Sequence, residues 1–220
     1  DIIHLESLSG RGAPKSALFE SQGTLRLRLY QPKDVYLSDI LPIMDDFGLT
    51  IIDSFATEVR SKGGTLHIDT LNIGGAKSGD LSLVRESAQL LVEAINAVFS
   101  EEVTSDPLNQ LVVSAGLHWK EVDVFRAYSG YMRQIMGNIA PSLTHEIVLG
   151  RPDLMRELTA LFKARFDPDL QEDRKKSIVK CEDSIEGHLR RILKHDEDMV
   201  FSTLCLLKSE ARAFCRSHSF

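Results

Sequence analysis

The stretch TIIDSFATEV at residues 50–59, with KGG at residues 62–64 and LHIDTLNI at residues 66–73 after it, decides the fold. The first run is β-branched and apolar, and the last alternates apolar with polar side chains; both patterns are typical of strands. Glycines between two such runs favour a turn. We therefore predict a β-hairpin from residue 50 to residue 73.

A third strand and a helix precede this hairpin. A period-two pattern that begins at Thr24 and ends before Pro32 indicates the strand. Its apolar positions are Leu25, Leu27 and Leu29. Ser38 is a good N-cap for the helix, and Gly48 can close it in a left-handed cap. Pro42 must then lie in the first helical turn, because it lacks the N–H that a helix interior uses.

A second helix follows the segment Gly74–Gly79, which we expect to be flexible. Asp80 or Ser82 would cap it, and its spacing points one apolar face inward: Val84, Ala88, Leu91, Ile95 and Val98 or Phe99. The order strand, helix, strand, strand, helix favours a sheet with two helices on one face, as in ferredoxin-like folds. A fourth strand is uncertain, because residues 101–106 are too short and acidic to supply it.

The rest of the chain shows helical periodicity without a convincing strand. We expect helices at residues 108–115, 119–136, 142–149, 152–166, 169–195 and 197–216. The fold class is thus α+β, a βαββα module followed by an all-helical bundle. The predicted domains are a loosely ordered lead-in at residues 1–22, the α+β domain at residues 23–104 and the helical domain at residues 105–220.

Composition excludes several classes of function. The chain has 220 residues, 43% of them hydrophobic, and a formal net charge of −6, which argues against nucleic-acid and anionic-lipid partners. Three cysteines without a close pair suggest neither disulfides nor a zinc knuckle, and they fit a cytoplasmic protein. No apolar run is long enough for a membrane span, and no signal peptide is recognisable. Both ends look cut from something longer, since the chain opens at Asp1 and stops at Phe220.

Two motifs resemble known binding sites, but the spacing of their residues does not match. Lys77-Ser78 follows glycines, but a phosphate-binding loop needs glycine where this chain has Asn72 and Ala76. Cys181, His188 and His195 recur every seven residues, which separates them by about 10 Å of helix rise, too far for one metal ion. No dinucleotide fingerprint GxGxxG and no GxSxG elbow occurs.

Other polar groups have structural explanations. Paired acids such as Asp45-Asp46, Glu101-Glu102 and Asp196-Glu197-Asp198 are expected near helix ends, where capping and dipole roles are common. Arg174-Lys175-Lys176 is diluted by acids and fits a solvated helical face. The stripe from Trp119 to Arg133 is mostly packing, with arginines free to pair with acids of a neighbouring domain. We assign no residue a catalytic, cofactor-binding or metal-binding role.

Several stretches resemble the large, single-chain NAD-specific glutamate dehydrogenases of bacteria. They are LSDILPIM (37–44) with FGLTIID (47–53), AGLHWKEV (115–122) with RAY (126–128) and YMRQ (131–134), and LFKARFDP (161–168). In that family, ACT-like modules and a helical motif precede the dehydrogenase domain. The resemblance implies that this chain is the last ACT-like module and the helical motif, and that its parent oxidatively deaminates L-glutamate with NAD.

The resemblance transfers no catalytic residue and no cofactor to this fragment, which we expect to be inactive alone. Its implied partners are the catalytic and other N-terminal domains of the same polypeptide and further copies of the parent. ACT modules often bind amino acids with a glycine in the loop after the first strand, and here that loop, Gln31–Asp34, has none. A structural or regulatory segment is therefore the leading hypothesis. An amino-acid-sensing module is the alternative, and an independent small enzyme is a third that no constellation of residues supports.

Overall fold

The computed structural model describes residues 14–61, 64–77, 81–136, 140–167, 174–192 and 197–204. Contacts within the chain group it into two compact units, residues 1–122 and 123–220, and each is described by itself. The predicted domain boundary after residue 104 stays a prediction.

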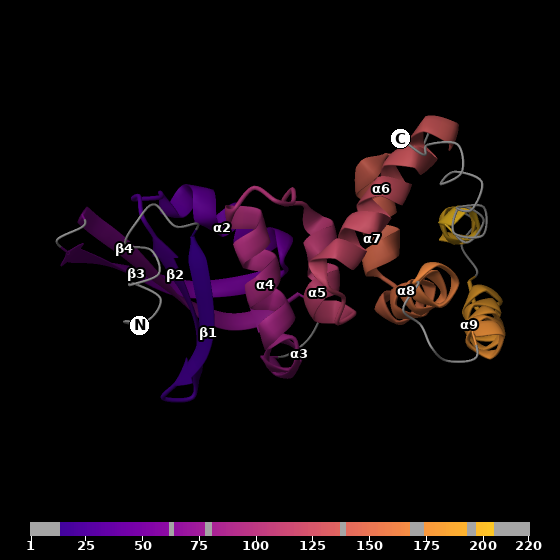
Figure 1. Ribbon diagram of the computed structural model, residues 1–220, viewed down its shortest axis with the longest axis horizontal. Coiled ribbons are helices and arrows are strands. Elements are labelled where there is room, and N and C mark those ends of the chain that lie inside the picture. Colours follow the sequence, from indigo (N-terminus) through magenta and orange to yellow (C-terminus); the bar gives the residue numbers. More distant parts are fainter. Residues whose placement is uncertain are drawn as a thin grey trace. The chain divides into compact units, whose positions relative to one another are not determined.

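The first unit is built on a four-stranded antiparallel sheet (Figure 1). Its strands are β1 (Lys15–Ser21), β2 (Thr24–Gln31), β3 (Leu49–Ser61) and β4 (Gly64–Ala76), in the order β1-β2-β4-β3. The predicted hairpin is confirmed as the pair of β3 and β4, although Lys62 and Gly63 of its turn lie outside the described residues. The predicted strand at residue 24 is confirmed too, with its three leucines buried.

The fourth strand comes from the N-terminal side, in residues that we expected to be a loose lead-in. That expectation is wrong for Lys15–Ser21, which pair with β2 along their whole length. Gln22 and Gly23 join the two strands and have positive φ angles of 53° and 75°, as a two-residue hairpin turn requires. Residues 101–106 supply no strand, as expected.

One face of the sheet is covered by helices. Ser16, which is opposite Leu29 in the register, donates from Oγ to the Val92 carbonyl oxygen of α4 (Ala88–Phe99). Because paired residues point to the same side, the face of Ser16 and the β2 leucines is the one under α4. The side chains of Ile40 and Met44 in α2 (Leu37–Asp46), which contacts β3, are buried as well.

The cap of α2 differs from the prediction. The helix begins at Leu37 with Tyr36 at the N-cap and no capping side chain, so Ser38 is not the cap. The Tyr36 carbonyl oxygen instead accepts from the amides of Asp39 and Ile40, at 2.9 and 3.3 Å. Pro42 lies inside the helix rather than in its first turn, at an exposed position. Gly48 closes the helix at φ +72°, as predicted.

Two further predictions of local structure need correction. Gly74, Gly75 and Ala76 belong to β4 rather than to a flexible segment, while residues 78–80 lie outside the described residues. The predicted long helix is two helices, α3 (Leu81–Glu86) and α4, separated at Ser87. Its expected inward residues Val84, Leu91, Ile95 and Val98 are buried.

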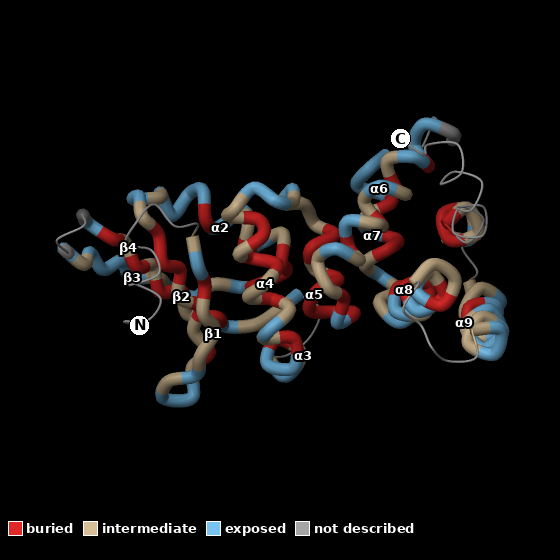
Figure 2. The backbone as a smooth tube through the Cα atoms, in the orientation of Figure 1, coloured by how far each residue is buried: buried red, intermediate tan, exposed pale blue. Residues whose placement is uncertain are grey.

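The remainder is helical, as predicted. The elements are η1 (Pro107–Asn109), α5 (Gln110–Ser114), α6 (Trp119–Met136), α7 (Pro141–Leu149), α8 (Pro152–Phe166) and α9 (Arg174–Leu189), and residues 197–204 are also helical. In the second unit α9 packs mainly on α8, and Ile185 is its one buried residue. Figure 2 shows that most of α9 is intermediate or exposed. No helix in the described part of the chain has both the length and the apolar character to span a bilayer.

Candidate functional site

A polar cluster at the end of β2 is the best candidate for a binding site in the first unit. Gln31 lies opposite His67, and Leu29 lies opposite Asp69, so all four share the face that α4 covers. Gln31 is 2% exposed and donates from Nε2 to Asp69 Oδ2 at 3.2 Å. His67 Nδ1 lies 3.8 Å from Oδ1 of Asp34, in the loop after β2.

Burial is the main electrostatic feature of this cluster. It raises the pKa of the Asp69 carboxyl, and the nearby Asp34 raises it further, while the hydrogen bond from Gln31 and the charge of His67 act in the opposite direction. A carboxylate whose charge is disfavoured in this way gains from an incoming cation. The cluster could therefore accept hydrogen bonds from an ammonium group.

Sequence reasoning missed this cluster. It considered the loop after β2 only for a glycine and assigned no site to His67. One signal was present: the apolar alternation of β4 changes phase between Ile68 and Leu71, which puts Asp69 on the same face as Leu71 and Ile73.

The structure gives Lys77 a structural role. Its amide donates to the Gly48 carbonyl oxygen at 2.7 Å, and its ammonium lies 2.5 Å from Asp45 Oδ1. The adjacent Asp46 accepts a 2.8 Å hydrogen bond from Ser105, and burial raises the pKa of its carboxyl. These contacts connect the end of α2 to the end of β4. Asp45 and Asp46 therefore have structural roles.

No group of three or more His, Cys, Asp or Glu is placed to hold a metal ion among the residues that the structure covers. Cys181 and His188 both lie on α9, and His195 is outside the described residues. Burial, with Glu157 nearby, raises the pKa of the Cys181 thiol, which makes it a poor nucleophile.

Several arginines of the helical unit bind their own neighbours. Arg126 pairs with Asp123 at 2.8 Å and Arg151 with Glu197 at 2.9 Å. Arg174 is not a purely solvated residue as expected, because it donates to the carbonyl oxygens of Arg165 and Asp167 at 3.1 and 2.5 Å. It thus satisfies carbonyls at the C-terminal end of α8.

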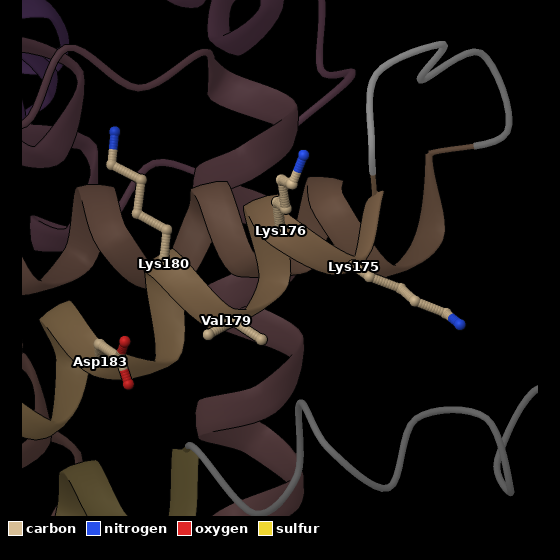
Figure 3. A pocket seen from close by; sticks show the side chains of 5 residues that line it. All are labelled: Lys175, Lys176, Val179, Lys180 and Asp183. Atoms are coloured by element: carbon tan, nitrogen blue, oxygen red, sulfur yellow. The ribbon is translucent and has the colours of Figure 1, made fainter.

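A hollow of about 420 Å³ lies along α9 (Figure 3). Its lining residues are Lys175, Lys176, Val179, Lys180 and Asp183. Figure 3 shows the lysine side chains extending in different directions from the helix. They do not converge on one point, so this hollow lacks the arrangement of a ligand site.

Comparison with known proteins matches both halves of the chain. A model of the glutamate dehydrogenase ACT3 domain matches residues 15–85, and a model of glutamate dehydrogenase helical motif 3 matches residues 103–168. The first includes β1 through most of α3, and the second includes η1 through α8.

Three curated relatives are NAD-specific glutamate dehydrogenases. That of Halomonas elongata is 29% identical over 206 residues, covering 91% of this chain and 13% of the relative. That of Pseudomonas aeruginosa is 30% identical over 227 residues, which cover 96% of this chain and 14% of the relative. That of Mycobacterium tuberculosis is 31% identical over 137 residues, which cover 60% of this chain and 8% of the relative. The chain therefore spans only a small part of the relatives it matches.

The fold and these matches define an ACT-like α+β domain followed by a helical region. More particularly, the chain carries the ACT3 domain and helical motif 3 of glutamate dehydrogenase, and it is distantly homologous over most of its length to the large NAD-specific enzymes.

Proposed function

We propose that this chain is a non-catalytic, structural and regulatory segment of an NAD-dependent glutamate dehydrogenase, whose full-length form oxidatively deaminates L-glutamate to 2-oxoglutarate. The observation that carries the proposal is that the ACT3 and helical-motif models together match most of the described fold. NAD would bind elsewhere in the cytoplasmic parent, and the partners of this segment would be the other domains of that polypeptide and further copies of it.

An activity assay of the 220-residue chain tests the proposal. Incubated with L-glutamate and NAD, the chain should produce no NADH above a protein-free control, while the native-length protein should produce it. Turnover by the chain alone would overturn the non-catalytic role. Absence of turnover in the native-length protein would overturn the assignment of the parent reaction.

A second candidate function, sensing of an amino acid, is favoured by the cluster of Gln31, Asp34, His67 and Asp69. The half-buried carboxyl of Asp69, whose pKa burial raises, suits the ammonium group of an amino acid. Thermal-shift measurements against the common amino acids test this function, because a ligand at about 100 times its dissociation constant adds about 2.7 kcal/mol of stability. A shift that Asp69→Asn abolishes would support sensing, and no shift with any amino acid would reject it.

A further inference from the structure

His118 directly precedes α6, the helix in which the chain passes from the first unit to the second. Its carbonyl oxygen accepts from the amides of Glu121 and Val122 at 2.9 and 3.1 Å, so His118 is the N-cap of this helix. Its own amide donates to Glu121 Oε2 at 2.8 Å. A side chain three residues after the N-cap that reaches back to the N-cap amide is half of a capping box.

The imidazole of His118 supplies the other half of the box. Its Nδ1 accepts from the amide of Lys120, the second residue of the helix, at 3.2 Å. Serine, threonine, asparagine and aspartate are the usual residues at this position, because a side-chain oxygen accepts such a bond. Histidine can replace them only through a ring nitrogen that carries no proton. The cap of α6 therefore depends on the neutral imidazole.

The other ring nitrogen faces a carboxylate. Because Nδ1 is an acceptor, the hydrogen of the neutral ring is on Nε2, which lies 3.3 Å from Glu93 Oε2 of α4. The second oxygen of this carboxylate accepts from Gln89 Nε2 at 3.0 Å, which holds Glu93 in place. The side chain of His118 is 33% exposed, so water can bring a proton to the ring.

The structure places charged groups from α4 and α6 around the ring, and their effects oppose one another. Glu93 and Glu121 attract a positive charge on His118, whereas the N-terminal end of α6 repels it. Trp119 lies between the imidazole and the ammonium of Lys120, with ring centroids 5.5 Å apart and the ammonium 5.3 Å from the indole. When the ring gains a proton both its nitrogens become donors, and the hydrogen bond from the Lys120 amide is lost.

We propose that His118 is a pH-dependent cap, which holds the first turn of α6 closed when the imidazole is neutral and opens it when the imidazole gains a proton. In the open form the ring pairs with Glu93 as a cation, and the Lys120 amide turns to water. Histidine is the side chain whose charge ordinarily changes between about pH 5 and about pH 8, so the cap responds within that range.

This inference goes beyond the proposed function, because it concerns the start of a helix and holds whatever reaction the parent protein catalyses. The first unit ends at Val122, so the turn that opens is the one immediately before the second unit in sequence.

Hydrogen exchange of the native-length protein, followed by mass spectrometry from about pH 5 to about pH 8, tests the proposal. After correction for the intrinsic exchange rate, amides in the first turn of α6 should exchange about fivefold faster at the acidic end, the effect of losing one N-cap bond. Amides in α8, which contains no histidine, should keep their protection. Equal protection of the α6 turn across the range, or an equal loss in α8, would overturn the proposal.

Substitutions of His118 show whether the imidazole is responsible. His118→Asn supplies a side-chain oxygen that caps at every pH in the range, so the turn should stay protected and its pH dependence should disappear. His118→Ala leaves the Lys120 amide uncapped, so the turn should exchange fast throughout. If the asparagine variant does not fold, as judged by circular dichroism, the alanine variant still tests the proposal. Either variant that folds and keeps the pH dependence of the unmodified protein would overturn it.

Glu121→Gln is the matched control for the carboxylate of the capping box. Glutamine still accepts from the His118 amide but cannot gain a proton in this range, so the turn should keep a pH dependence. Loss of the pH dependence in this variant would show that the carboxylate, and not the imidazole, controls the cap, and the proposal would fail.

Discussion

The bond between the first strand and α4 gives the sharpest test of the fold. Ser16 is 4% exposed, and its amide donates to Asn96 Oδ1 at 2.7 Å. Its hydroxyl donates to the same oxygen at 2.9 Å and has the Val92 carbonyl oxygen as a second acceptor at 3.3 Å. Asn96→Ala should therefore leave the hydroxyl with a partner and the buried Ser16 N–H with none.

The expected cost follows from that single unsatisfied donor. A buried N–H without an acceptor costs about 1–3 kcal/mol, so the thermal midpoint of a chain of this size should fall by roughly 2–12 °C. Hydrogen exchange followed by mass spectrometry should localise the loss, because protection of the amides in residues 15–31 should decrease more than protection of those in α8.

Matched variants complete the test. Gln89→Ala removes an exposed side chain from the same helix, one that bonds only to Glu93 at 3.0 Å, and should change the free energy of unfolding by less than about 0.5 kcal/mol. Ser16→Ala keeps the N–H bond to Asn96 and should cost less than Asn96→Ala. If Asn96→Ala proved as mild as Gln89→Ala, the reasoning that α4 anchors β1 would be refuted.

Three further changes have expected outcomes. Gly48→Ala should lower the free energy of unfolding by about 1–2 kcal/mol in thermal melts, because φ is +72° there and a Cβ would lie 3.0 Å from Gln110 Cγ; Gly75→Ala, in open space, should be nearly neutral. Leu27→Ala, at a position with 0% exposure, should cost about 2–5 kcal/mol in urea unfolding. Because the pKa of Asp69 is raised in the folded state, its carboxyl stabilises the fold fully below pH 3.8, and this stabilisation is lost as the pH rises through the folded-state pKa. Asp69→Asn should therefore be more stable than the unmodified chain at pH 7. In unfolding measured below pH 3.8 this gain should vanish.

Periodicity predicted the elements that have apolar faces. The leucines of β2, the hairpin of β3 and β4, and the helices of the second half all show a repeating pattern that burial confirms. β1 was not predicted because Ser16 is its one buried residue. An edge strand of this kind shows no alternation of apolar and polar residues that a sequence pattern could reveal. The short turn at Gln22-Gly23 was the remaining signal.

Pattern analysis could indicate the sheet face on which Asp69 lies, but it could not predict that Gln31 is its partner. The hydrogen bond between Gln31 and Asp69 joins residues 38 apart in sequence, and the exact register of β2 on β4 brings them together. A one-residue slip would move Asp69 to the sheet face opposite α4. Apolar alternation alone does not specify this register between strands that are far apart in sequence.

The place of β1 in the chain also affects how quickly the sheet is completed. Two residues join it to β2, whereas a strand supplied after α4 would have to find β2 across roughly 70 residues. By the logarithmic dependence of closure entropy on length, that difference amounts to about 3 kcal/mol. The sheet therefore acquires its fourth strand through a local contact, and its assembly need not wait for the helices that follow.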